Sequence, residues 1–134
     1  MTNEGELTDC EGNIMSLEEA LAKVRGQKLT AVQFIHDYVQ FGFESGNLGA
    51  SLSAYAHPTV RVAGHELDWS SPLFRHELCL RINRTVVDTW MDEQQISIGF
   101  DDGGLFIVPI RGRDSEGLES FELRVEGIKT VWVG

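Results

Sequence analysis

Five residues have side chains suited to binding a partner, and four of them lie close together in the sequence. His65, Glu66, Asp68 and Trp69 belong to one polar stretch, and Trp90 lies on a predicted strand beside acidic residues. A tryptophan ringed by polar groups is typical of the anchor of a protein–protein interface. A tryptophan in a loop can instead fold back over the edge of the core. We take these five as the candidate binding residues and keep both interpretations open.

No catalytic or metal-binding motif is recognisable. The histidines, among them His57 and His76, have neither C-x-x-C nor H-E-x-x-H around them, so we expect no metal site. Cys79 lies between two leucines and is expected to be buried and inert. Carboxylate pairs such as Asp101 and Asp102 lie at predicted turns or helix starts, where acids serve local geometry and are poor acid catalysts. We therefore expect neither an enzyme nor a cofactor.

The net charge of the chain is −10, from 21 acidic and 11 basic residues. Such a surface repels phosphate backbones, and lysine and arginine form no cluster, so we expect no nucleic-acid partner. The charge favours a basic protein partner, although an acidic excess also serves solubility alone. No apolar run approaches the roughly 18 residues of a membrane span, and the N-terminus lacks a signal-peptide pattern. We expect a cytoplasmic protein with no membrane partner.

The helices that would support these residues are signalled locally. Residues 1–13 are polar and acidic and are expected to be a disordered tail, followed by a single α+β domain at 14–134. Ser16-Leu-Glu-Glu19 has the pattern of a capping box and predicts a helix that Gly26 ends. A second helix is predicted for residues 72–82, with serine at its cap and proline at its first position.

The predicted strands form two similar groups. The stretch Val39-Gln-Phe-Gly-Phe-Glu-Ser-Gly-Asn-Leu48 aligns without gaps with Ile96-Ser-Ile-Gly-Phe-Asp-Asp-Gly-Gly-Leu105, at an offset of 57 residues. Each belongs to a predicted three-stranded meander with an acidic glycine turn, and similar turns alone would also produce such an alignment, so duplication and coincidence both remain open. The fold class predicted is α+β: an antiparallel, meander-rich sheet, or two apposed sheets, of six or more strands packed with two helices. The strands are expected near 28–35, 39–43, 48–54, 59–62 (a short edge strand), 85–91, 95–100, 105–110, 121–125 and 128–133, with a loop at 63–71.

Small residues in two of these segments bear on where function lies. In residues 48–54, glycine and serine alternate with leucine and alanine, which suggests that something packs close against that strand. The glycines of the repeated stretches serve hairpin geometry first. We therefore expect function in the insert between the two copies, residues 55–82.

Three segments together resemble a group of known proteins. They are Lys28-Leu-Thr-Ala-Val32, Asp37-Tyr-Val-Gln-Phe-Gly-Phe43 with the acidic turn that follows it, and Ile98-Gly-Phe-Asp-Asp-Gly-Gly-Leu105. The pattern is similar to that of small uncharacterised bacterial domains of unknown function, some of which are grouped with immunity proteins of toxin systems. The resemblance covers roughly residues 26–110 and rests on hairpin features, so it transfers no functional residue. It implies a bacterial binding protein.

Three functions are consistent with the sequence. The first is a non-enzymatic, immunity-like module that binds a protein, for example by neutralising a basic toxin domain. The second is a small-ligand-binding or enzymatic domain with a pocket between the sheet and helix 72–82, which a space filled by Phe74, Leu78 and Phe41 would remove. The third is homodimerisation through a sheet edge.

Overall fold

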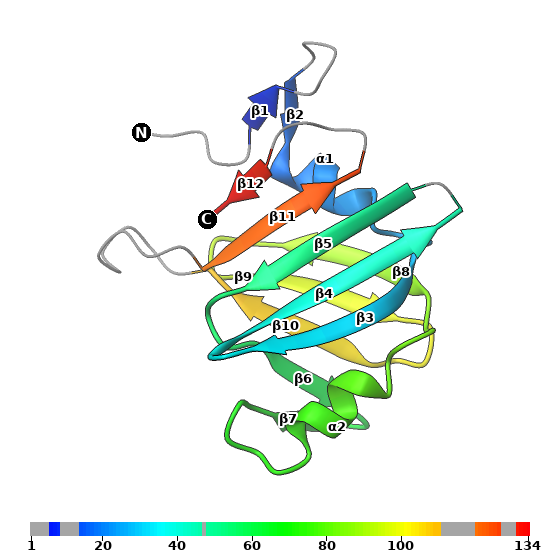
Figure 1. The fold of residues 1–134 in the computed structure, drawn as a ribbon, viewed down its shortest axis with the longest axis vertical. Helices are drawn as coiled ribbons and strands as arrows, with labels where there is room; N and C mark the ends of the chain where they lie inside the picture. Colours follow the sequence, from blue (N-terminus) through cyan, green and yellow to red (C-terminus); the bar gives the residue numbers. More distant parts are fainter. Residues whose placement is uncertain (1–5, 9–13, 47, 111–119, 127–130) are drawn as a thin grey trace.

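The fold is built from two antiparallel β-sheets that pack face to face, with two short helices at opposite ends (Figure 1). The computed structural model describes residues 6–8, 14–46, 48–110, 120–126 and 131–134. Within these residues, the first sheet has the strand order β12-β11-β5-β4-β3 and the second has the order β7-β6-β10-β9-β8. A separate hairpin pairs β1 with β2. The α+β class and the antiparallel, meander-rich sheets are confirmed.

The bounds of the elements agree with most of the predicted ones. Strands in the first sheet are β3 (Lys28–Ile35), β4 (Tyr38–Ser45), β5 (Leu48–Ala54), β11 (Phe121–Val125) and β12 (Val131–Val133). Strands in the second sheet are β6 (Thr59–Val62), β7 (His65–Leu67), β8 (Val86–Met91), β9 (Gln95–Phe100) and β10 (Leu105–Pro109). The remaining elements are β1 (Glu6–Thr8), β2 (Ile14–Ser16), α1 (Leu17–Ala22) and α2 (Phe74–Cys79).

The two meanders lie in different sheets and share one register in their first hairpin. Leu29 pairs with Phe43 in β3–β4, and the residues 57 positions later, Val86 and Phe100, pair in β8–β9. The register also shifts at equivalent places, directly after Leu29 and directly after Val86. This agreement extends the sequence alignment to the backbone of the first hairpin, and duplication stays a hypothesis.

The agreement ends at the second turn of each meander. Leu48 pairs with Ser45, whereas Leu105, its counterpart in the alignment, pairs with Gly99. Gly46 and Gly103 both have positive φ, at 58° and 87°, which is the conformation that a glycine turn permits. The same sequence pattern therefore closes two turns of different length.

The hydrophobic core fills the space between the sheets. Phe106 of the second sheet lies 4.8 Å from the ring of Phe41 in the first sheet and 4.7 Å from Phe100. Alternate residues of β4 are buried, as expected for a strand with one face on the core. Both helices contribute fully buried side chains, namely Ala20, Leu21, Phe74 and Leu78. The core thus joins both meanders and both helices.

Helix α1 begins as predicted and ends earlier than predicted. Glu19 N donates to Ser16 Oγ at 3.1 Å, and Ser16 N donates to Glu19 Oε1 at 3.0 Å, so the capping box is present. The helix stops at Ala22, and Gly26, with φ at 85°, turns the chain into β3. No helix among the described residues is long and apolar enough to cross a membrane.

Helix α2 is shorter than the predicted span 72–82. It covers Phe74–Cys79 and has no side-chain cap, because its N-cap residue is Leu73, which has no side-chain acceptor. Ser71, the predicted cap, lies outside the helix and bonds Asp68. Phe74 and Leu78, four residues apart, face the core. Cys79 follows Leu78 at the end of the helix and is exposed, so the expected burial of its thiol was wrong.

Three further expectations about the strands need revision. The segment 63–71, predicted as a loop, contains β7, and β6 is an inner strand because it pairs with both β7 and β10. Glu6–Thr8, within the expected disordered tail, forms β1, while residues 1–5 and 9–13 lie outside the described residues. Sequence gave no signal for these short strands, since each is held by pairing with a neighbour and has little apolar pattern of its own.

Replacing the cap of α1 tests whether the capping box stabilises the domain. Ser16→Ala removes the acceptor for Glu19 N and is expected to lower the free energy of unfolding by about 1 kcal/mol. Urea denaturation followed by circular dichroism measures this loss. Glu18→Ala, at an exposed position of the same turn, is the control, and an equal loss in both variants would contradict a specific role for the cap.

Candidate functional site

Trp69 packs against the protein at the end of the sandwich. Its ring stacks on His57 at a centroid distance of 4.0 Å and an interplanar angle of 6°, and lies 5.6 Å from the ring of Phe74. The guanidinium of Arg75 lies 5.2 Å from the Trp69 ring and 5.1 Å from the ring of Phe34. Half-buried in this way, Trp69 covers the edge of the core, which is the second of the two interpretations drawn from the sequence.

The aromatic cluster also joins the two sheets. His57 Nε2 donates to the backbone oxygen of Asp37, in the β3–β4 turn, at 3.0 Å. Through the stack with Trp69 that contact ties the first sheet to the chain that follows β7. His57 therefore holds structure, and the described residues contain no group of three or more metal-ligating side chains.

Asp68 holds the loop that carries Trp69. Its Oδ1 accepts from the hydroxyl of Ser70 at 2.7 Å and from Ser70 N at 3.0 Å, and also from the hydroxyl of Ser71. These hydrogen bonds lower the pKa of Asp68, and the bond from the Ser70 hydroxyl has the largest effect. The carboxylate is thus committed to the loop geometry.

The other three candidate residues lie on strands outside this loop. His65 and Glu66 are exposed on β7, where Glu66 pairs with Arg61 at 2.8 Å. Trp90, with 44 % of its surface exposed, lies on β8, at the opposite edge of the second sheet. It packs beside Gly99, whose Cβ, if present, would lie 3.6 Å from the indole. The structure does not bring the five residues into one site.

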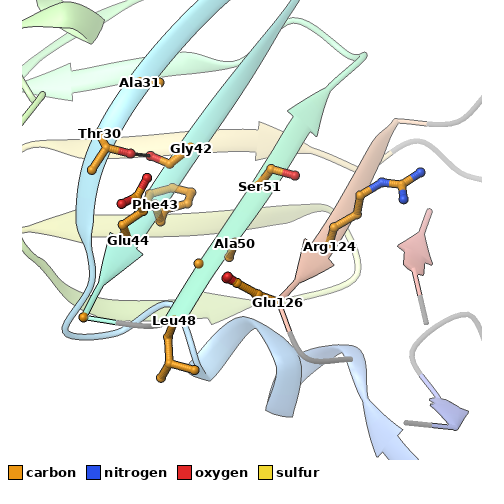
Figure 2. A pocket seen from close by; sticks show the side chains of 12 residues that line it. Thr30, Ala31, Gly42, Phe43, Glu44, Leu48, Ala50, Ser51, Arg124 and Glu126 are labelled. Carbon is orange, nitrogen blue, oxygen red and sulfur yellow. Dashed lines mark hydrogen bonds between the residues drawn. The ribbon is translucent and has the colours of Figure 1, made fainter. Parts of the chain in front are cut away.

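The outward face of the first sheet contains a groove that the sequence did not single out (Figure 2). Its volume is about 720 Å³, and it runs along β5, whose outward residues are small. Glu44 and Gly49 pair across β4–β5, and Glu126 N donates to Gly49 O on the other side, so two glutamates flank one glycine. We call this groove the β5 trough; its floor is Gly42, Gly49 and Ser51, and its walls carry Glu44, Arg124 and Glu126.

The charges of the β5 trough are uneven. Arg124 Nε lies 2.6 Å from Glu122 Oε2, so its charge is compensated, and its side chain extends away from β5 (Figure 2). Within the described part of the chain, neither Glu44 nor Glu126 has an ion pair. The Glu126 carboxylate lies over Gly49, 3.6 Å from the position that a Cβ would take. The trough therefore presents two carboxylates without ion pairs above a floor with little side chain, with Lys28 directly opposite Glu44 on β3.

An aromatic pair lies further along the same outward face. The rings of Tyr38 and Tyr55 are 4.9 Å apart, and Tyr55 Oη donates to Glu122 Oε1 at 3.3 Å. Burial, followed by the negative charge of Glu122, raises the pKa of Tyr55. Polar, neutral side chains thus continue the face beyond the glutamates.

Two features of the sequence correspond to the β5 trough. Glycine and serine occupy alternate positions of β5, a pattern that predicts close packing by another segment. Among the described residues, the face that carries Gly49 and Ser51 instead forms the open floor of the trough. Gly42, between two buried phenylalanines, contributes to the same floor. The signal lacking in sequence is the register, since Glu44 and Glu126 meet only because β4 and β11 both pair with β5.

The second acidic turn has a structural role. Asp102 Oδ2 accepts from Arg81 Nε at 2.8 Å, and Arg81 also pairs with Glu77 at 3.2 Å, so α2 and the chain after it are tied to the β9–β10 turn. Burial opposes ionisation of Asp102, but the N–H of Gly104 and the guanidinium of Arg81 outweigh it and lower its pKa. Arg84 lies 3.6 Å from the same carboxylate. Asp102 is a link in this ion network.

The two tryptophans are expected to differ in their effect on stability. Trp69→Ala removes a ring packed on three neighbours and should lower the free energy of unfolding by about 2 to 3 kcal/mol, somewhat below the roughly 3–5 kcal/mol of a fully buried aromatic. Trp90→Ala, at a more exposed position, should cost about 1 kcal/mol. Chemical denaturation of both variants measures the difference, and a larger loss for Trp90→Ala would contradict the packing role of Trp69.

The ion network predicts a pH-dependent effect of Asp102→Asn. Because the pKa of Asp102 is lower in the folded protein, its stabilisation is complete above the unfolded value of about 3.8 and is lost as pH falls through the folded value. The variant should be less stable than the natural protein by about 2 kcal/mol at pH 7, and the gap should shrink below about pH 4. Urea denaturation across pH 3–8 checks this, and a gap that is constant with pH would contradict it.

Comparisons with known proteins give no match from which a family could be inferred. No protein-family model, no curated protein and no solved structure matches the chain.

Proposed function

We propose that this protein is a non-enzymatic binding module whose protein partner docks a basic, extended segment in the β5 trough. One observation supports this above the others. Two glutamates without ion pairs flank a glycine floor on an outward sheet face, in a chain whose net charge is −10. Charge of one sign in a groove attracts and orients a partner of the opposite sign.

The dimensions of the trough suit a lysine or arginine side chain. Neighbouring strands are about 4.8 Å apart, so β4 and β11 flank β5 at about 10 Å. Glu44 on β4 and Glu126, directly after the end of β11, lie in one cross-strand row with Gly49 between them. A cationic side chain over Gly49 would reach both carboxylates, and both resulting pairs would be charge-assisted.

The rest of the face supports a polypeptide partner rather than a small molecule. The trough is open and continues into Tyr38 and Tyr55, and Leu48, 57 % exposed, stands at its other end. Tyrosine is enriched in protein interfaces because its ring adds contact area at low entropic cost. An extended segment lying along β5 would contact both ends.

The alternative pocket between the sheet and α2 has less support. Phe74 and Leu78 of α2 are fully buried in one cluster with Phe41, so side chains fill the inner side of this helix. Phe41 further contacts Phe106 from the opposite sheet. These contacts favour the binding module over a ligand pocket at that place.

The resemblance to bacterial domains grouped with immunity proteins suggests the class of partner. Immunity proteins neutralise toxin domains by binding them, and an acidic surface would complement a basic toxin domain. In this proposal, the β5 trough is the part of the acidic surface that contacts the toxin.

Charge reversal in the trough tests the proposal. The double variant Glu44→Lys with Glu126→Lys raises the net charge from −10 to −6 and places repulsive charge at the site. Immobilised natural protein should capture a basic protein from the native host at low salt, identified by mass spectrometry. The trough variant should lose that protein by at least about tenfold, because each like-charge contact costs several kcal/mol.

A matched variant separates the trough from net charge. Glu18→Lys with Glu93→Lys also gives −6, at exposed positions outside the trough. This control should keep the captured protein, and thermal melts should show that both variants are folded. Equal loss in the two double variants, or no captured protein even at low salt, would contradict the proposal.

A further inference from the structure

The edges of the two sheets differ in how their outward backbone groups are used. In an antiparallel pair, successive residues direct their N–H and C=O groups alternately toward the partner strand and away from it. Leu29 of β3 directs them away from β4, and they are taken up by Arg84 O, at 3.0 Å, and Asn83 N, at 2.8 Å. Residues 83–84 thus cover the start of the β3 edge.

Beyond Leu29, no strand of the described ranges pairs with the outer edge of β3. Ile35 and Tyr38 close the β3–β4 hairpin, so alternation directs the groups of Val32 and Phe34 outward. Among the described residues, no backbone hydrogen bond joins either of them to another segment beyond this sheet. Their side chains face the core but are only half-buried, unlike those of Val39 and Phe41 on β4. This pattern marks an open strand edge.

The equivalent edge of the second sheet is covered. Thr89 of β8 is the counterpart of Val32 in the shared register. Arg25 Nη2 donates to Thr89 O at 2.7 Å, its Nε donates to Thr89 Oγ1 at 3.0 Å, and α1 packs against β8. Thr89 is accordingly only 2 % exposed. Proteins cover strand edges in this way to prevent pairing with other chains. In the part of the chain that the structure describes, Arg75 lies over the Phe34 ring, but the outward backbone groups of Val32 and Phe34 have no such hydrogen-bonded cover.

We propose that a second copy of this chain pairs with β3 along the edge from Thr30 to Ile35. An antiparallel pair with its two-fold axis at Gln33 sets Val32 opposite Phe34 of the second copy, and Phe34 opposite its Val32. Both residues direct their backbone groups outward, so this register forms four hydrogen bonds with every outward group paired. The two first sheets then become one continuous sheet of ten strands, five from each copy.

Charge selects a second copy as the occupant. The residues from Leu29 to Ile35 carry no charge in a chain of net charge −10, so two copies can approach here with the least repulsion. Arg84, whose backbone covers Leu29 at the start of this edge, directs its guanidinium to Asp101 and Asp102, so it adds no unpaired charge to the paired strands.

The pairing is tested by the oligomeric state. Analytical ultracentrifugation of the natural protein across about 1 to 500 μM is expected to show a monomer–dimer equilibrium. Val32→Pro removes the outward N–H at a position where an edge strand tolerates proline, and should abolish the dimer. Val32→Ala loses a similar amount of side chain but keeps the N–H, and should still dimerise.

Substitutions at Gln33 test the register. Gln33→Lys and Gln33→Glu each place like charges opposite each other on the two-fold axis and should weaken the dimer about fivefold, while a mixture of the two should form a heterodimer. Gln40→Lys, in the same cross-strand row one strand further in, is the control and should have little effect, because its charges lie more than a screening length apart. A strict monomer at 500 μM, or a dimer unaffected by Val32→Pro and by both Gln33 variants, would overturn the proposal. If Val32→Pro does not fold, the Gln33 mixture decides.

Discussion

Four backbone hydrogen bonds fix the first sheet to the second, and the placement of both meanders depends on them. Gly26 N donates to Val86 O and Val86 N to Gln27 O, both at 2.8 Å, while Leu29 exchanges bonds with residues 83–84. They join the start of β3 to the start of β8, which are edge strands of different sheets. Face-to-face packing alone allows sheets to slide and rotate, whereas a strand-like seam sets their relative register.

The seam also explains why the two edges are unequal. It uses the outward groups of Leu29 and Val86, so it covers only the start of each edge. Gly26 turns the chain sharply between α1 and β3, which places Arg25 beside β8 and within reach of Thr89. On the first sheet, α2 contacts β3 through the Arg75 guanidinium over the ring of Phe34. Among the described residues, no side chain bonds the backbone of Val32 as Arg25 bonds that of Thr89, so the β3 edge is less covered than the β8 edge.

Sequence was sufficient where structure is local. The capping box at Ser16, the strands of both meanders and their hairpins were predicted because short-range periodicity and turn residues determine them. The direction of Trp69 was not predictable, since it depends on a stack with His57 from a distant turn. The β5 trough was missed for a similar reason: strands far apart in sequence contribute its walls, and only the sheet order brings them together. The insert 55–82 contains β6, β7, α2 and the packed loop of Trp69, and function in this insert stays a prediction.

The two acidic turns show how far a shared pattern can differ in role. Glu44 and Asp101 occupy equivalent positions in the alignment, and the sequence suggested turn geometry and solubility for both. In the second turn, Asp101 and Asp102 face Arg84 and Arg81 from the chain that follows α2, so their charge is used within the fold. In the first turn no arginine approaches Glu44 among the described residues, and a three-residue difference in pairing directs the chain into β5 instead. Glu44 has no ion pair among the described residues, whereas Asp101 and Asp102 have them, which is why we propose a binding role for the first meander rather than the second.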